Sequence, residues 1–333
     1  MRHITPALAG VVLVILAIAL LLGAGACSIA SLTGVDFFRQ AFAVFLGGGL
    51  TLLPIGLGLA LADFFYFLPR RGITKSVPYE PLVDDSVTVV LTAYNDEESI
   101  GQSVHDFLAH PKVKRVIVVS NNSKDRTMEV AAAAGATVFN ETVQGYGACS
   151  HRSLYESLQC KDTDLTILCE GDMTFRAHDI DKFLAYAPHT DIAIGTRTNH
   201  PLQDSDTQVT TFIHYGNYFV AKLIELKHLG KVTLSDVGTT YKLCRNRALE
   251  ELLPLLNPHL NLEFNPYFLD LALQHGFKVV ECPITFYRRV GVSKGGNVSN
   301  LVAFKLGMRM IWGILSNWRS QNGEFTTRHD RWA

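Results

Sequence analysis

SVTVVLTA, residues Ser86–Ala93, runs straight into the polar sequence YNDEE at Tyr94–Glu98. An apolar, β-branched run of this length predicts a buried strand, and the polar residues predict where that strand ends. The pattern recurs along the chain, with further strands expected at Lys114–Ser120 and Asp164–Cys169 and helices at Glu98–Ala109 and Asp125–Ala134. Strands that alternate with helices predict an α/β domain, in which helices cover both faces of a mainly parallel sheet.

Polar residues follow three of the expected strands, at the edge where ligands of such sheets bind. After Tyr94–Glu98 come Asn121–Thr127 (NNSKDRT) and the pair Glu170 and Asp172 around Gly171. None of these clusters is a GxGxxG or GxxxxGK[ST] loop, which argues against a dinucleotide dehydrogenase and a P-loop nucleotidase. Two carboxylates after a strand suit Mg²⁺ or Mn²⁺, which prefer oxygen ligands, although a solvated turn is the alternative for such a pair.

The charge and cysteine content exclude two other classes of protein. The 30 basic residues balance 31 acidic ones, for a net charge of −1, so there is no basic field to bind nucleic acid. The six cysteines form no CxxC pair and no zinc-ligand spacing, and several lie in apolar runs. They are therefore expected to be buried thiols in a reducing compartment.

Two apolar stretches near the start of the chain predict a transmembrane hairpin. Ala7–Ala26 supplies the roughly 20 apolar residues that a helix needs to span a bilayer, and Ala41–Ala62 is a second uncharged stretch. Basic residues flank the pair at Arg2 and within 70–75, whereas the link Ser31–Gln40 holds one acid and one base. The positive-inside rule predicts a multi-pass protein of the cytoplasmic (inner) membrane, with both ends of the hairpin in the cytoplasm. A cleaved signal peptide is the alternative for the first stretch.

Taken in order, the strand-end clusters resemble the motifs of glycosyltransferase family 2, and most closely those of polyprenyl-phosphate and dolichyl-phosphate sugar synthases. The family's Pro-x-Tyr-Asn-Glu is similar to Thr92–Asp96, its Asp-Asp-x-Ser-x-Asp-x-Thr to Ser120–Thr127, and its Asp-x-Asp to Glu170–Asp172. Later motifs of the family resemble Gly195–Arg197, Asp236 with Thr239–Lys242, Glu281–Ile284 and Arg288–Lys294. The resemblance covers about Val87–Lys294 and implies the GT-A fold of that family.

The resemblance also implies a role for each matching residue. It makes Asp172, Asp236 and Arg197 catalytic, and it makes Asp172 and Glu170 the ligands of Mg²⁺ or Mn²⁺. Substrate contacts are implied for Ala93, Tyr94, Asn95, Asp96, Asn121, Ser123, Gly171, Arg288, Ser293 and Lys294. The alternatives are a surface ion pair for each arginine and a helix or turn cap for Asp236.

The sequence departs from the family pattern at three positions. Ser120 and Asn121 replace the two aspartates expected to hold the nucleoside, so the identity of the base stays open. The amide of Asn121 still offers a donor and an acceptor to a base. Glu170 replaces an aspartate and lengthens one arm of the metal site, which leaves Asp172 as the main expected ligand.

The function that the resemblance implies is that of a membrane-anchored, inverting glycosyltransferase. Such an enzyme uses a divalent metal ion to move a sugar from a nucleotide-sugar to a lipid-linked acceptor, here expected to be polyprenyl phosphate. Two alternatives are a transferase that acts on a neutral lipid or saccharide and a catalytically silent membrane binding protein of the same fold. Homo-oligomer formation is left open.

Composition divides the chain into four parts: two transmembrane helices over 1–71, a linker over 72–85, the GT-A-like catalytic domain over 86–296, and a C-terminal helix and tail over 297–333. In the last part, Asn300–Trp318 is too polar to span a bilayer. Lys305, Arg309, Gly313 and Ser316 fall on one helical face and apolar side chains surround them, which is typical of a helix lying in a membrane interface. Packing on the domain or on another subunit is the alternative.

Overall fold

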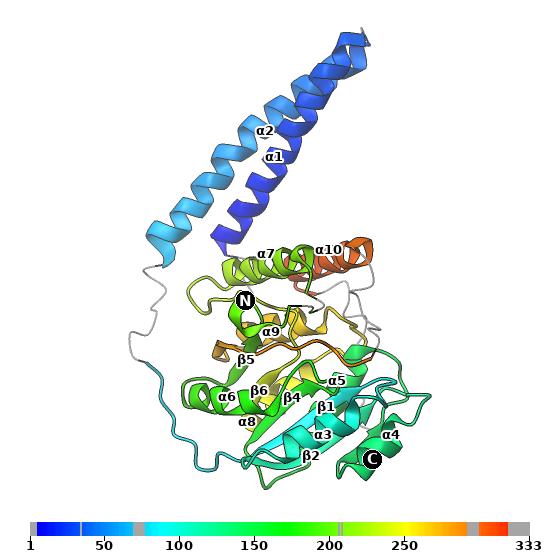
Figure 1. The fold of residues 1–333 in the computed structure, drawn as a ribbon. Helices are drawn as coiled ribbons and strands as arrows, with labels where there is room; N and C mark the ends of the chain where they lie inside the picture. The colour runs from blue at the N-terminus through cyan, green and yellow to red at the C-terminus, as the bar shows by residue number, and fades with distance from the viewer. Residues whose placement is uncertain are drawn as a thin grey trace. The chain divides into compact units, whose positions relative to one another are not determined.

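The computed structural model describes residues 5–33, 35–68, 77–205, 207, 209–291 and 300–318. The chain divides into two compact units, Met1–Lys75 with Glu225–Lys231, and Ser76–Ile224 with Val232–Ala333. Figure 1 shows the helical hairpin of the first unit and the sheet of the second. The first unit contains the apolar stretches, and the second contains the strand-end motifs.

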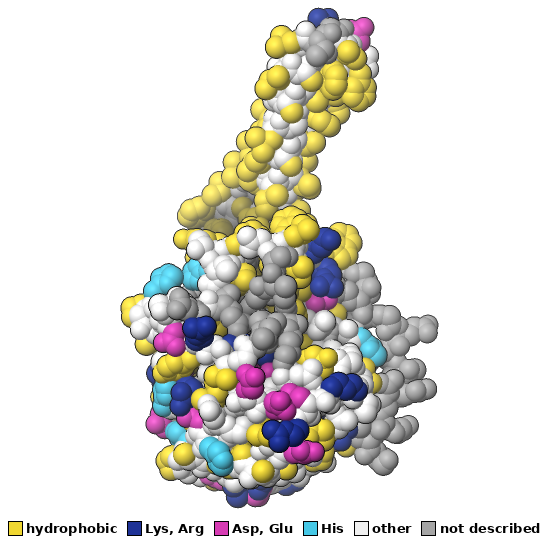
Figure 2. Space-filling view, turned by 45° about the vertical axis from the view of Figure 1, so that its right-hand side comes forward, with side chains coloured by type: hydrophobic (Ala, Val, Ile, Leu, Met, Phe, Trp, Pro, Cys, Tyr) yellow, Lys and Arg dark blue, Asp and Glu magenta, His cyan; other side chains and the backbone are white. Residues whose placement is uncertain are grey.

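The first unit is built on two long apolar helices, α1 (Pro6–Ala30) and α2 (Asp36–Ala62), and α2 continues as a π-helical turn, η2 (Asp63–Phe67). Both helices are long and apolar enough to cross a membrane, judged by length and composition. The surface of this hairpin is mostly hydrophobic (Figure 2). The predicted two-helix hairpin is therefore present, and its helices are longer than the predicted stretches.

Glycine contacts and a buried carboxylate hold the hairpin together. A Cβ at Gly10 would lie 2.5 Å from the carbonyl oxygen of Gly56, so the two backbones pack closer than larger residues would allow. The buried carboxylate of Asp63 accepts a hydrogen bond from the backbone nitrogen of Ala7, at 2.7 Å. A negative charge at this position also interacts favourably with the positive end of the α1 dipole.

The described residues of the second unit form a seven-stranded sheet with the order β3-β2-β1-β4-β6-β5-β7. Its strands are β1 (Val87–Ala93), β2 (Val113–Ser120), β3 (Thr137–Asn140), β4 (Leu165–Glu170), β5 (Ile192–Thr196), β6 (Lys242–Arg245) and β7 (Val279–Pro283). Strand β6 runs antiparallel to β4 and β5, and the other pairings are parallel. The prediction of a mainly parallel sheet is confirmed, and β1, β2 and β4 match their predicted bounds to within one residue.

Helices cover both faces of this sheet, and two further helices, α7 and α10, lie beyond one of its edges (Figure 1). The described helices that follow the hairpin are α3 (Ile100–Leu108), α4 (Thr127–Ala133), α5 (Tyr146–Leu158), α6 (Ile180–Tyr186), α7 (Thr211–Lys227), α8 (Asn246–Leu252), α9 (Phe264–Gln274) and α10 (Asn300–Ser316). On one face, a buried core joins Leu91 of β1 and Ile167 of β4 to Phe107 of α3 and Phe183 of α6. On the other face, α5 packs across β1, β2 and β4 and contacts α8.

The end of α10 is anchored on the domain. Trp318 is buried and donates a hydrogen bond from Nε1 to Oδ2 of Asp270 in α9, at 2.8 Å. Gly313 lies in the packed face of α10 and not in a polar face as predicted, because the Trp318 ring lies 2.3 Å from the place of a Cβ there. The exposed apolar side chains of α10 are Leu301, Val302, Phe304, Met308 and Trp312. The helix therefore packs on the domain with one face and presents apolar side chains on another.

Part of the expected linker is docked on the domain. The Glu80 carboxylate pairs with Arg247 at 2.7 Å and with Arg245 at 3.2 Å, and the backbone nitrogen of Glu80 donates to the carbonyl of Pro188. The second unit therefore includes residues before Ser86, and 72–76 of the predicted linker lie outside the described residues.

Candidate active site

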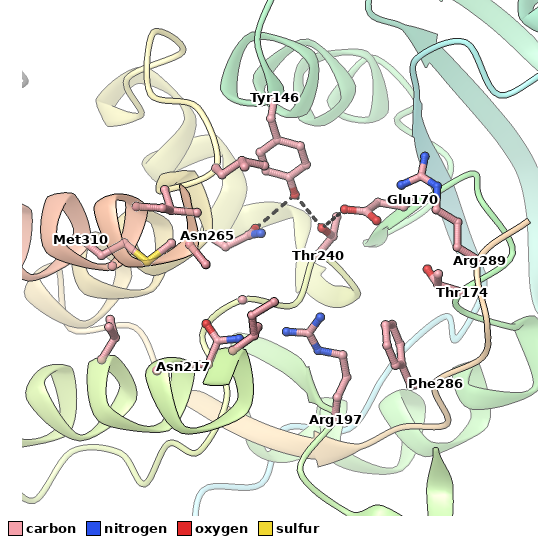
Figure 3. Close-up of a pocket in the computed structure, with 18 of the residues that line it drawn as sticks. Tyr146, Glu170, Thr174, Arg197, Asn217, Thr240, Asn265, Phe286, Arg289 and Met310 are labelled. Carbon is pink, nitrogen blue, oxygen red and sulfur yellow. Dashed lines mark hydrogen bonds between the residues drawn. The ribbon is translucent and has the colours of Figure 1, made fainter. Parts of the chain in front are cut away.

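A pocket of about 180 Å³ opens beside the ends of β4 and β5. One part of its wall is polar and includes Asp172. Glu170, Arg197 and Arg289 belong to the same part (Figure 3). Another part is apolar and comes from two helices, with Phe212, Ile213 and Val220 of α7 and Ala303, Leu306 and Met310 of α10. The pocket thus joins charged groups at the strand ends to an apolar wall.

The two predicted metal-binding carboxylates line this pocket together. Glu170 ends β4, and Asp172 follows after Gly171, where a Cβ would lie only 2.3 Å from the Ile100 side chain. Glycine at this point leaves room for the Ile100 side chain. Oδ1 of Asp172 accepts hydrogen bonds from the backbone nitrogen and the hydroxyl of Thr174, at 3.1 and 2.5 Å. These bonds fix the orientation of the Asp172 carboxylate.

Electrostatics make this corner of the pocket favourable for a cation. Burial, together with the neighbouring charge of Asp172, raises the pKa of Glu170 to about 7. Within the described ranges, no group of three or more His, Cys, Asp or Glu side chains forms a complete metal site. Mg²⁺ commonly binds through one or two carboxylates and completes its shell with substrate phosphates and water. The oxygen donors of Glu170 and Asp172 fit an ion of that kind.

Within the Arg288–Lys294 motif, the structure brings Arg289 into the pocket and leaves Arg288, the predicted substrate contact, outside it. Arg289 lines the pocket, with Nη1 3.1 Å from Oδ2 of Asp172 and Nη2 2.9 Å from Oδ1 of Asp96. Arg288 is exposed, and its backbone nitrogen donates to Asp204. Neighbouring side chains of an extended segment point to opposite sides, so only one of two adjacent arginines can face the pocket. The sequence shows that the two arginines are adjacent, but it does not show which of them faces the pocket. Ser293 and Lys294 lie outside the described residues.

Arg197 and Asp236 form a buried ion pair. Nε and Nη2 of Arg197 donate to the two carboxylate oxygens of Asp236 at 2.7 and 2.9 Å, and Gly238 N donates to Asp236 as well. Burial opposes the charge of Asp236, but the charge and hydrogen bonds of Arg197 outweigh it and lower the Asp236 pKa. Arg197 lines the pocket, whereas the Asp236 carboxylate is occupied in holding Arg197. The catalytic roles of both residues stay predictions.

The predicted nucleoside contacts gather at the ends of β1 and β2. They are Ala93, Tyr94, Asn95, Asp96, Asn121 and Ser123. The Ser123 hydroxyl accepts from Asn95 N at 3.0 Å, and Ala93 O accepts from Asn121 N at 2.8 Å, so the two strand ends are tied together. The amide of Asn121 donates to Val143 O at 2.7 Å and accepts from Gly145 N at 2.8 Å. Both ends of this amide hold the 141–145 loop, and its pairing with a base stays a prediction.

A buried polar network at the bottom of the pocket was not predicted. Tyr146 Oη lies 2.7 Å from the Thr240 hydroxyl and donates to Asn265 Oδ1 at 3.2 Å, and Thr240 donates to Glu170 at 2.8 Å (Figure 3). Lys242 donates to the same Asn265 oxygen at 2.8 Å, and burial lowers its pKa to about 8. Thr240 and Lys242 lay within a recognised motif, but nothing in the sequence singled out Tyr146 or Asn265. These side chains present hydroxyl and amide groups toward the metal-binding corner.

Comparisons with known proteins identify the family of this chain. A family model described as "Glycosyltransferase like family 2" matches residues 84–306. The dolichyl-phosphate hexose transferase of Haloferax volcanii is 26% identical over 211 residues, which cover 63% of this chain and 86% of that protein. An uncharacterized glycosyltransferase of Mycobacterium bovis is 36% identical over 104 residues, which cover 31% of this chain and 44% of that protein.

A solved structure shares the fold. Glucosyl-3-phosphoglycerate synthase from Mycobacterium tuberculosis, in complex with Mn²⁺, uridine diphosphate and phosphoglyceric acid, superposes with a TM-score of 0.52. The two are 15% identical, and the match covers 73% of this chain and 87% of the synthase. The family match spans the sheet, both carboxylates, Arg197 and Arg289. This chain therefore belongs to glycosyltransferase-like family 2 and is a glycosyltransferase of the GT-A fold.

Proposed function

We propose that this enzyme transfers a sugar, with inversion, from a nucleotide-sugar to polyprenyl phosphate, and that it requires Mg²⁺ or Mn²⁺. The observation that carries the proposal is the two-part wall of the pocket. Charged groups at the strand ends suit a diphosphate and a phosphate, and the apolar wall between α7 and α10 suits a hydrocarbon chain. The H. volcanii relative is named for an acceptor of this class.

The donor end is the corner formed by Glu170, Asp172 and Arg289. Asp172 and Glu170 would hold the metal ion, which supplies positive charge to the departing diphosphate. Arg289 adds a guanidinium beside them, and guanidinium groups bind phosphates through paired hydrogen bonds. The hydroxyl and amide groups of Tyr146 and Asn265 would orient the sugar.

The acceptor end is the part of the pocket that contains Arg197. This guanidinium is buried and held by Asp236, so it is fixed for binding an acceptor phosphate. A phosphate oxygen is already ionised, and the enzyme then needs no strong base to activate it. Each buried CH₂ of a prenyl chain contributes about 0.8 kcal/mol, so the wall of Ile213 and Leu306 would favour a long chain.

Exposed apolar side chains near this wall support an acceptor that resides in a membrane. On α7, Phe212, Tyr215 and Phe219 are exposed, and on α10, Phe304 and Trp312 are exposed. Aromatic side chains of this kind are enriched where proteins meet the lipid interface.

The acceptor is tested by offering polyprenyl phosphate, neutral polyprenol and phosphoglycerate to the purified enzyme and measuring product mass. We expect product from polyprenyl phosphate alone. Leu306→Gln should weaken the use of long-chain acceptors, whereas Leu301→Gln, on the exposed side of the same helix, should not. Preference for the neutral lipid or for phosphoglycerate would contradict the proposed acceptor and leave the glycosyltransferase assignment intact.

We also propose that α1 and α2 span the membrane and that the catalytic domain is cytoplasmic. The predicted basic flank, Arg2 and residues 70–75, lies outside the described residues and supports this by composition alone. A cysteine introduced at Lys75 should resist an impermeant thiol reagent in intact cells and react after lysis. A cysteine introduced at Phe37, in the first turn of α2 next to the link between the helices, should react in intact cells, and the reverse pattern would refute the topology.

A further inference from the structure

Arg289 occupies a position that the proposed metal ion needs. Its Nη1 lies 3.1 Å from Oδ2 of Asp172, the oxygen that the Thr174 bonds leave open. A divalent ion and a guanidinium compete for this one oxygen, because the two positive charges repel each other at such short range. Binding of the metal ion is therefore weakened as long as the Arg289 side chain stays in this position.

Asp96 stabilises the present position of Arg289. Nη2 of Arg289 lies 2.9 Å from Oδ1 of Asp96, while the other Asp96 oxygen accepts from Tyr94 N at 2.8 Å. The guanidinium thus bridges two carboxylates that come from the ends of different strands, β1 and β4. The positive charge of Arg289 neutralises part of the negative charge of the Asp96 and Asp172 carboxylates, which lie close together in a buried corner of the pocket.

Hydrogen bonds hold the backbone on both sides of Arg289 in place. The guanidinium can therefore change position only by a rotation of the Arg289 side chain. Tyr287 N donates to Thr174 O at 2.9 Å, and Val290 N donates to Asp172 O at 3.1 Å. The buried Nε of Arg289 has no hydrogen-bond acceptor among the described residues. A donor diphosphate would supply acceptors for that group and for the two terminal nitrogens, in the paired geometry that guanidinium favours.

We propose that Arg289 is a cationic gate on the metal site. Without donor it pairs with Asp172 and Asp96 and competes with the metal ion, and with donor it turns to the diphosphate and frees Asp172. This inference rests on the proposed metal- and nucleotide-dependent function. Its consequence is coupling: the metal ion binds weakly alone and much more tightly together with a diphosphate.

The test measures Mn²⁺ binding to the purified full-length enzyme in detergent, by the loss of the free-ion electron paramagnetic resonance signal. Binding is measured with and without inorganic pyrophosphate as the probe, and Mn²⁺ bound by pyrophosphate in solution is subtracted from a protein-free titration. Removal of one charge-assisted contact is worth about tenfold or more in an equilibrium constant. We therefore expect Arg289→Gln to bind Mn²⁺ alone about tenfold more tightly than the wild type, and to lose most of the enhancement by pyrophosphate.

Arg288→Gln is the matched control, because it removes the same charge from the neighbouring exposed position. It should leave both affinities unchanged. Arg289→Lys keeps a cation of different shape and should bind Mn²⁺ with intermediate affinity, which guards against a folding defect in the glutamine variant. Unchanged or weaker binding of Mn²⁺ alone by Arg289→Gln and Arg289→Lys would overturn the gate.

The variant Asp172→Asn distinguishes a failure of the gate proposal from a failure of the proposed metal-dependent function. If Asp172→Asn loses Mn²⁺ binding while Arg289→Gln binds as the wild type does, the metal site stands and the gate is refuted. If the wild-type enzyme transfers sugar but binds no Mn²⁺ even with pyrophosphate, the metal requirement fails and the gate fails with it.

Discussion

Substitution of Asp236 by asparagine should uncouple the buried ion pair beneath the pocket. The variant keeps the shape of the side chain and removes its charge, so Arg197 is left as a buried cation without its counter-ion. Breaking a buried pair by removing one partner costs about 3–5 kcal/mol. At about 2–4 °C per kcal/mol for a domain of this size, the melting temperature should fall by about 6–20 °C.

The control is an exposed pair of similar geometry. Asp162 accepts hydrogen bonds from both terminal nitrogens of Arg115 at the surface, where such pairs contribute about 0–1 kcal/mol. Asp162→Asn should therefore shift the melting temperature by only a few degrees at most. Calorimetry on the purified variants makes the comparison, and an equal shift for Asp236→Asn and Asp162→Asn would refute the reasoning.

The pH dependence gives a second check on the same pair. Because the folded-state pKa of Asp236 lies below its ordinary value of 3.8, its contribution to stability is fully present above that value. The contribution is lost as pH falls through the lower, folded-state pKa. The difference in stability between wild type and Asp236→Asn should therefore stay constant from neutral pH down to about pH 5 and shrink in stronger acid.

Three further predictions concern the metal corner and α10. Asp172→Asn should abolish sugar transfer while Glu170→Asp retains much of it, and transfer by Asp172→Asn at the wild-type rate would exclude the metal role. With the Glu170 pKa raised from 4.5 to about 7, the metal-free enzyme should lose stability as pH rises through that window, and Glu170→Gln should remove the loss in a pH series of melting curves. Gly313→Ala should lower the melting temperature because its Cβ would meet the Trp318 ring, whereas Gly307→Ala, with open space at its Cβ, should not.

Local sequence patterns were enough to predict the elements of this fold. Apolar runs such as Ser86–Ala93 become strands because continuous β-branched residues can be buried on both faces of a parallel sheet. The polar residues after them collect at one edge of the sheet because parallel strands point the same way. For that reason Glu170 and Asp172 could be placed at a ligand-binding edge before any contact was known. The length and hydrophobicity of α1 and α2 are likewise properties of the sequence alone.

The partners of the polar side chains were decided by tertiary structure. Arg289 reaches Asp96 across 193 positions of the chain, and no local pattern distinguishes it from Arg288. Asn121 and Asp236 have side chains that suit substrate, yet the fold places backbone donors and Arg197 within their reach first. Whether a hydrogen bond forms depends on differences of a few tenths of an ångström in the distance between donor and acceptor. Only the packing of elements that are distant in the sequence sets this distance. Sequence thus determined which residues could do chemistry here, and the packed structure determined which of them face the pocket.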